Sequence, residues 1–344
     1  MKRKAPSSKN KAVIAFASAT ALLATPVAAS ERTRMEDGTY SVDVYSLNQA
    51  EASKMLADFR AQAPDAQTRD NILAKFNYLK AEITKDAQTH GYTAYQAERI
   101  AGTLAGSYTI SRAVMPDGTQ VIKTFDDLNP SAINGLTPVT RTVLFYDNDK
   151  KVTGQVCTIA APARNHTLEM WLKSFTQISN IDASALPAAY QPMITDMVNF
   201  HEQAHCFGAD ENASDYIAAL RVLNKYRSTP ETTQNFLRLF SGTRNFASEF
   251  RNVSQDYLLA GSYIQMAADD FKANPDKYKT DKDILALINN NGIPDLVRAQ
   301  SVDEAHFMNS LKEMAESLKV KFCNEEDAIG EFLGRRSAPK NCIK

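Results

Sequence analysis

The sequence lacks the features that mark several common protein classes. Its 344 residues include 13 glycines, 13 prolines and a single tryptophan, with no internal repeat and no low-complexity tract. This excludes a collagen-like or largely disordered chain. There is no glycine-rich phosphate loop, no G-x-S-x-G nucleophile elbow and no calcium-binding loop. What remains is an ordinary globular composition, 44% apolar and 23% charged, with enough length for about two domains.

An excess of positive charge is also missing. The formal net charge is −1, from 39 basic and 40 acidic residues. Five of the basic residues lie within the first 29 positions, which contain no acid, so the rest of the chain carries 34 basic against 40 acidic residues. Because a nucleic-acid-binding surface needs a basic stripe, we expect no nucleic-acid partner.

The first 29 residues have the three parts of a secretory signal peptide. Its positive start contains Lys2, Arg3, Lys4, Lys9 and Lys11. An apolar stretch spans residues 12–23, Pro26 ends it, and the small residues at 27–29 suit a cleavage site. We predict cleavage near Ala29 and an exported protein, periplasmic or secreted, with no stable membrane span afterwards. The alternative is an uncleaved N-terminal anchor.

Four cysteines, Cys157, Cys206, Cys323 and Cys342, are an even number in a chain predicted to be exported. Disulfides persist in oxidising compartments. A bridge between Cys323 and Cys342 would tie down the polar C-terminal tail and leave Cys157 to pair with Cys206. Four cysteines allow three connectivities, and all three stay open at this point.

Apolar residues recur at three- and four-residue steps over residues 47–105 and over most of the chain after residue 166, which indicates helices. Between these regions β-branched and aromatic residues alternate. Residues 108–125 and 140–160 each fit a hairpin. We therefore predict an α+β protein that is mostly helical, with a small antiparallel sheet before a helix that begins near Pro192.

The residues that point to chemistry lie in the segment 200–216, FHEQAHCFGADENASDY. His201 and His205 are four residues apart, so on a helix they stand on one face, one turn apart. That spacing allows two imidazoles to hold one metal ion. Glu202 lies beside His201, where a carboxylate can act as general base toward a metal-activated water. The histidines continue the apolar stripe of the same helix and therefore face inward.

A second helix is predicted directly after this one. Gly208 suits the left-handed conformation that ends a helix, and Asp210 suits the N-cap of the next. Glu211 and Asp215 are four residues apart and share a face of this second helix. If it folds back past the first helix, Glu211 comes nearest to the two imidazoles, and Asp215 can accept the N–H of a metal-binding histidine.

These residues resemble the zincin metallopeptidases. HEQAH, from His201 to His205, matches their HExxH motif, and ENASD, residues 211–215, resembles the E-x-x-x-D helix of the gluzincin branch. The six-residue interval from His205 to Glu211 is similar to the metzincin motif HExxHxxGxxH, which has glycine at the position of Gly208 and histidine at that of Glu211. The resemblance covers about 30 residues, combines two branches and points to no single family within them.

The residue pattern divides the chain into a helical N-terminal region at residues 30–105, which could also be a pro-segment, and a second part at residues 106–344. In the second part, the sheet would span residues 107–160, the active-site helices residues 192–226 and a helical C-terminal part residues 230–344. The resemblance implies that this second part is a zincin-like catalytic domain.

The resemblance also implies roles for individual residues. His201, His205 and Glu211 would bind one zinc ion per chain, Glu202 would activate the zinc-bound water, and Asp215 would accept a hydrogen bond from a ligating histidine. The third ligand stays open, and the alternatives to Glu211 are Asp215, Asp210, Cys157 and His306. The sequence also allows the two histidines to be ordinary buried residues, hydrogen-bonded to Asp196 or Asp215.

We therefore expect an exported zinc-dependent metallopeptidase that hydrolyses peptide bonds of protein or peptide substrates, with cleavage preference and oligomeric state left open. By analogy with zincins, the strand predicted at residues 152–160 would be the sheet edge that aligns the substrate backbone. Two alternatives remain. One is a metal-dependent amidase acting on cell-wall or other amide bonds, and the other is a non-catalytic, zincin-like binding protein.

Overall fold

The computed structural model describes residues 30–114, 120–124, 139–161, 168–169, 171–172, 186–250, 260–290 and 292–293. The predicted signal peptide, His306, Cys323 and Cys342 lie outside the described residues. So do residues 294–344, which include most of the part predicted to be a helical C-terminus.

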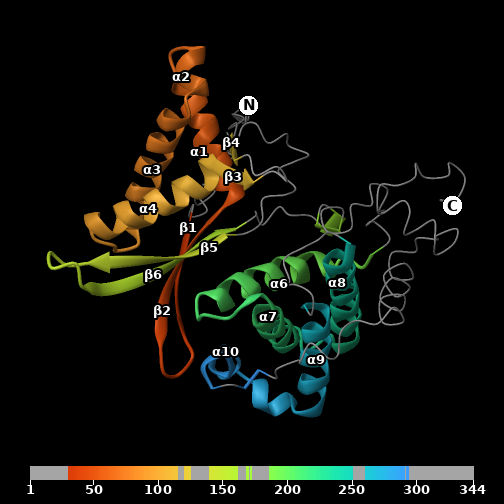
Figure 1. Cartoon of the computed structure of the whole chain (residues 1–344). Helices are drawn as coiled ribbons and strands as arrows, with labels where there is room; N and C mark the ends of the chain where they lie inside the picture. Colours follow the sequence, from red (N-terminus) through yellow and green to blue (C-terminus); the bar gives the residue numbers. More distant parts are fainter. Residues whose placement is uncertain are drawn as a thin grey trace, which may run out of the picture.

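A four-stranded mixed sheet lies between two groups of helices (Figure 1). Its order is β1–β2–β6–β5, where the strands are β1 (Ser30–Glu36), β2 (Ser41–Asn48), β5 (Val139–Tyr146) and β6 (Val152–Ala161). β1 pairs with β2 and β5 with β6 in antiparallel fashion, whereas β2 and β6 are parallel. The predicted α+β, mostly helical fold class is confirmed. The sheet is mixed, however, and not wholly antiparallel as expected.

The first two strands lie in the region that was expected to be helical. In β2, Val42 and Val44 are buried on one face of the sheet, and Tyr45 and Leu47 on the other. This alternation has the two-residue period of a strand, and helical periodicity begins only afterwards, so the expectation for residues 30–48 is wrong. Because β2 pairs with β6, the sheet joins residues from both sides of the boundary predicted at residue 105.

Helices α1 (Gln49–Gln62), α3 (Ile72–Thr89) and α4 (Ala94–Thr109) cover one face of the sheet, with the short α2 (Ala66–Asp70) at the far end of this group (Figure 1). A capping box between Asn48 and Glu51 begins α1 directly after β2. The core beneath these helices includes Tyr45, Leu47, Ile83, Leu104 and Val156.

Both predicted hairpins are present. β3 (Ile110–Val114) and β4 (Gln120–Thr124) form a separate two-stranded antiparallel sheet, and β5 and β6 form the second hairpin. β6 lies between β2 and β5, so the expectation that residues 152–160 form the sheet edge is wrong. The edge strands of the four-stranded sheet are β1 and β5.

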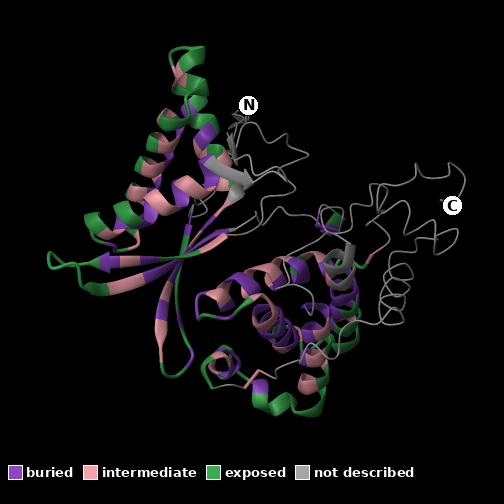
Figure 2. Ribbon diagram, viewed as in Figure 1, coloured by how far each residue is buried: buried purple, intermediate pink, exposed green. Residues whose placement is uncertain are grey.

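The opposite face of the sheet is covered by a second helical group. It consists of α6 (Tyr190–His205), α7 (Glu211–Lys225), α8 (Pro230–Phe250), α9 (Ala260–Ala273), the 3-10 helix η4 (Pro275–Tyr278) and α10 (Asp281–Asn289). Figure 2 shows α7 buried along most of its length. Ile217, Leu220 and Val222 of α7 belong to the same core as Cys157 and Ile159 of β6. Among the described helices, none is both long and apolar enough to cross a membrane.

A disulfide joins Cys157 on β6 to Cys206, the residue that caps the C-terminus of α6, with Cα atoms 5.6 Å apart. Of the three connectivities left open by the sequence, the two that pair Cys157 or Cys206 with Cys323 or Cys342 are therefore excluded. The bridge fixes the end of α6, which carries the HExxH motif, against an inner strand of the sheet.

Candidate metal centre

Helix α6 carries the two histidines on its buried side. His201 is buried and His205 is half-buried in the last turn. Their rings lie edge to face with centroids 4.8 Å apart, as expected for residues one helical turn apart. Pro192 lies in the first turn of this helix, and Met193, Ile194 and Met197 continue the buried stripe toward the histidines.

A short turn reverses the chain between α6 and α7. Gly208 has a φ of +89°, the left-handed conformation expected for it, and its N–H bonds the carbonyl of His205 at 3.0 Å. Asp210 is the N-cap of α7, where its side chain accepts from the N–H of Ala213 at 2.8 Å. This turn places Glu211, the first residue of α7, beside the histidines.

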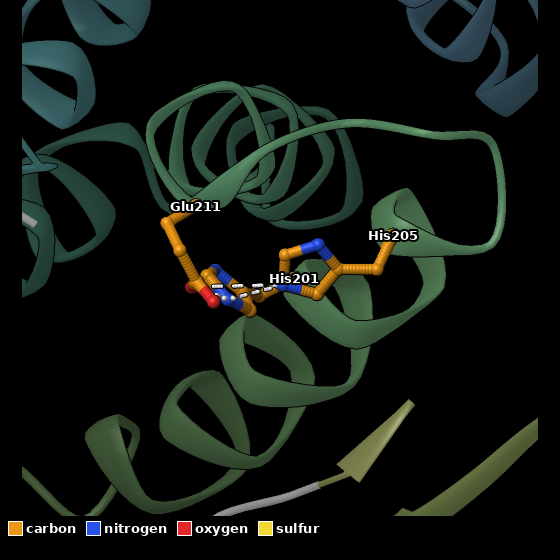
Figure 3. A group of neighbouring side chains, drawn as sticks. All are labelled: His201, His205 and Glu211. Carbon is orange, nitrogen blue, oxygen red and sulfur yellow. Dashed lines mark hydrogen bonds and ion pairs between the residues drawn. The ribbon is translucent and has the colours of Figure 1, made fainter. Parts of the chain in front are cut away.

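Three side chains converge on one point (Figure 3). His201 Nε2 and His205 Nε2 are 3.1 Å apart. The same Glu211 oxygen, Oε2, is 3.1 Å from His201 Nε2 and 3.6 Å from His205 Nε2. The structure thus brings together the three residues predicted to be metal ligands.

In each ring the other nitrogen, Nδ1, points away from the common point and has its own hydrogen-bond acceptor. His201 Nδ1 donates to Asp215 Oδ1 at 2.7 Å, the contact predicted for Asp215. His205 Nδ1 donates to the carbonyl oxygen of Ala209 at 2.8 Å. A neutral imidazole that carries its proton on Nδ1 presents a lone pair at Nε2. Both lone pairs and the Glu211 carboxylate therefore face the common point.

The electrostatics of this cluster favour positive charge. Burial lowers the pKa of His201, but the charge and hydrogen bond of Asp215, together with Glu211, raise it to about 9. Burial also lowers the pKa of His205, and its hydrogen bond with Glu211 raises it above its ordinary value. Burial alone would raise the pKa of Glu211, but the two imidazoles hold it well below its usual range. Asp215 and Glu211 thus favour a cation at this point: without a metal ion it is a proton on the imidazoles, which a bound metal ion would displace.

The distances and the donor set fit zinc. Zinc–nitrogen bonds of about 2.0–2.1 Å in a tetrahedron place neighbouring ligand atoms roughly 3.3 Å apart. The three separations here are 3.1, 3.1 and 3.6 Å. Two imidazoles and one carboxylate are a known zinc ligand set, and three protein ligands leave a fourth position open for chemistry.

Glu202 lies on the sheet side of α6 and is buried. Its Oε2 accepts a hydrogen bond from Thr140 Oγ1 of β5 at 2.5 Å, and its main-chain oxygen lies 3.2 Å from the same hydroxyl. Among the residues that the structure describes, no hydrogen bond or ion pair joins the Glu202 carboxylate to the three converging groups. The hydrogen bond described for this carboxylate is to the strand β5 and not to the cluster.

The alternative ligands that the structure describes do not face the common point. Asp210 is an exposed helix cap, and Cys157 is in the disulfide, so neither is a ligand. Asp215 bonds the far side of His201 instead of facing the common point. Asp196 bonds Lys225 and Tyr226, away from both rings. His306 lies outside the described residues.

Two contributors from distant parts of the chain were not predicted from sequence. Thr140 bonds Glu202, and Arg244 of α8 donates to Asp215 Oδ1 at 3.1 Å, which places a positive charge behind the fully buried carboxylate. Each of these residues lies on a separate element, far in sequence from residues 201–215. No local sequence pattern therefore connects either of them to the site.

Comparisons of the chain with family models, with curated proteins and with solved structures give no match. The motif at residues 201–215 and the geometry around it are therefore the basis for assigning a function. That geometry can hold a divalent metal ion and has a buried carboxylate next to it in the helix.

Proposed function

We propose that this protein is an exported, zinc-dependent metallopeptidase. The observation that carries the proposal is the convergence of His201 Nε2, His205 Nε2 and one Glu211 oxygen within 3.6 Å of one another. Nitrogen ligands support zinc over calcium or magnesium, which prefer oxygen. Glu202 occupies the position next to the first ligand, as in the HExxH motif.

Each of these residues has a separate task in the proposed reaction. His201, His205 and Glu211 hold the ion, and a bound zinc ion lowers the pKa of water and polarises a carbonyl. The Glu202 carboxylate takes the proton of the attacking water and delivers it to the leaving amine. Thr140 bonds Oε2 of that carboxylate, which leaves Oε1 to accept the proton.

An extended peptide is the substrate that suits this arrangement. Within the described residues, β5 pairs with β6 on one side only, so its other edge can bond a peptide main chain. Thr140 of the same strand touches Glu202. A peptide paired with β5 would therefore pass close to the proposed general base. This favours peptide bonds over the amide bonds of cell-wall sugars.

Export is supported by two features of the chain. The first 29 residues have the composition of a signal peptide with cleavage near Ala29. The Cys157–Cys206 disulfide would persist in the periplasm or outside the cell but would tend to be reduced in the cytosol.

Two variants test the metal ligands and the base separately. His201→Ala should lose the zinc ion, measured as about one zinc per chain in the parent protein. Glu202→Gln should keep the zinc ion and abolish cleavage of an unfolded protein substrate. Glu98→Gln, an exposed change on α4, is the matched control and should retain both.

The outcomes separate the alternatives. Proteolysis retained in the Glu202→Gln variant would refute the assignment of the base. Cleavage of cell-wall amides but not of peptides by the parent protein would favour the amidase. Bound zinc without turnover of either substrate would favour a binding protein.

A further inference from the structure

A pocket of about 480 Å³ opens beside His205. This size lies within the range of about 300–1,000 Å³ that is typical of ligand sites. Its walls come from the β1–β2 turn, strand β5, the end of α6 and the end of α10. Because His205 contributes to the lining, the pocket adjoins the candidate metal centre.

The lining is aromatic on one side and polar but uncharged on the other. The rings of Tyr40 and Phe207 meet edge to face with centroids 5.7 Å apart. Thr142 and Asn289 add a hydroxyl and an amide. The pocket as the structure describes it has no aspartate, glutamate, lysine or arginine in its lining, and His205 is assigned to the metal. Such a lining suits an uncharged, largely apolar group.

A buried carboxylate holds one wall of the pocket in place. Asp37 accepts the N–H groups of Thr39 and Tyr40 at 2.8 and 2.7 Å, and Asn289 donates to its other oxygen. Burial alone would raise the pKa of Asp37, but these hydrogen bonds lower it, so the group is a fixed negative charge behind the wall. An acidic ligand would be repelled by this charge. A basic ligand would find both oxygens already bonded and would lie close to the metal centre.

Strand β5 connects this pocket to the proposed general base. Thr140 and Thr142 are two residues apart, so they share a face of the strand and lie roughly 7 Å apart along it. Thr140 bonds Glu202, and Thr142 lines the pocket. A peptide paired with β5 has the same two-residue period, so a residue near the base can direct its side chain into the pocket.

We infer that this pocket selects an uncharged aromatic or aliphatic side chain of a peptide substrate, next to the bond that is cleaved. The inference rests on the proposed peptidase function and adds a substrate class to it. The pocket is preorganised, because Asp37 fixes the wall that contains Tyr40, and the Cys157–Cys206 disulfide fixes the wall at the end of α6. Preorganised contacts of this kind discriminate in binding as well as in turnover.

The test uses four peptides that are identical except for phenylalanine, leucine, aspartate or lysine at one position beside the cleaved bond. The zinc-loaded protein should cleave the first two with kcat/KM about tenfold or more above the others. Binding of the same peptides to the zinc-loaded Glu202→Gln variant, measured by calorimetry, should follow the same order. This second measurement observes the pocket without requiring turnover.

Charged substitutions at the pocket wall should redirect the preference. Thr142→Arg should raise kcat/KM for the aspartate peptide relative to the lysine peptide by about tenfold, and Thr142→Asp should do the reverse. The matched control is Arg141→Glu. Arg141 is the exposed neighbour on β5 that faces the other side of the strand, so this change should leave the preference as it is.

Equal rates and equal binding for the four peptides, or unchanged preference in both Thr142 variants, would overturn the inference and leave the peptidase proposal standing. If the parent protein cleaves no peptide, the proposed function fails. In that case, binding of the four peptides to the zinc-loaded Glu202→Gln variant shows whether the pocket prefers uncharged side chains. Stronger binding of the phenylalanine and leucine peptides supports it, and equal binding overturns it.

Discussion

Thr140 of the edge strand β5 donates a hydrogen bond to the carboxylate of Glu202 on α6, with 2.5 Å between Oγ1 and Oε2. The two residues are 62 positions apart in the chain. Through this bond, the strand proposed to pair with substrate also fixes the orientation of the proposed general base.

Replacing Thr140 by valine removes that hydrogen bond and keeps the shape of the side chain. We expect a kcat about tenfold lower, because the carboxylate is no longer held in one orientation. KM and zinc content should stay unchanged, and Thr140→Ser should restore kcat. Steady-state kinetics with metal analysis checks this, and a Thr140→Val variant with the parent kcat would show that the bond has no part in positioning the base.

Asp215 is expected to strengthen metal binding without touching the metal. It accepts the Nδ1 proton of His201 and so directs Nε2 toward the common point. Asp215→Asn should lower zinc affinity by about 10- to 100-fold, measured by competition with a chromophoric chelator. Asp196→Asn is the control, since Asp196 bonds Lys225 and Tyr226 and neither ring. Equal zinc affinity in the two variants would contradict the role given to Asp215.

The Cys157–Cys206 disulfide should stabilise the fold. It closes a loop with a sequence separation of 49 residues, for which the loss of unfolded-state entropy corresponds to about 4 kcal/mol. Replacing both cysteines by alanine should lower the free energy of unfolding by up to this amount, as measured by denaturant titration. The parent protein treated with an alkylating agent without reductant is the control. If the double variant unfolds at the same denaturant concentration as the parent protein, the bridge does not constrain the unfolded chain.

Asp37 should make stability depend on pH in the acid range. Its pKa in the folded chain lies below its ordinary value, since its hydrogen bonds outweigh the effect of burial. A carboxyl of this kind stabilises the fold above about pH 4 and loses this effect as the pH falls further. Asp37→Asn should therefore lower the free energy of unfolding by about 2 kcal/mol at pH 7 and by much less near pH 3. A difference between variant and parent that is the same at both pH values would show that ionisation of Asp37 is not responsible.

The parts of the site that sequence predicted are local in the chain. Helical spacing places His201 and His205 on one face, and the conformations of Gly208 and Asp210 determine how the chain turns into α7. Glu211 follows His201 by only ten residues. Short-range rules of helix periodicity and capping are sufficient for such a cluster.

The parts that sequence did not predict depend on distant segments. The parallel pairing of β2 with β6 joins residues more than a hundred positions apart, and Arg244 reaches Asp215 across 29 positions. Such contacts are decided by how whole elements pack, and a single threonine or arginine has no local pattern that marks it. For the same reason β5, and not β6, turned out to be the edge of the sheet.

The most direct test of the metal centre is a crystal structure of the zinc-loaded protein with anomalous diffraction measured at the zinc absorption edge. We expect one strong anomalous peak per chain, about 2.0–2.2 Å from His201 Nε2, His205 Nε2 and a Glu211 carboxylate oxygen. A zinc-loaded crystal with no peak at that point, or with its zinc bound elsewhere on the chain, would contradict this expectation.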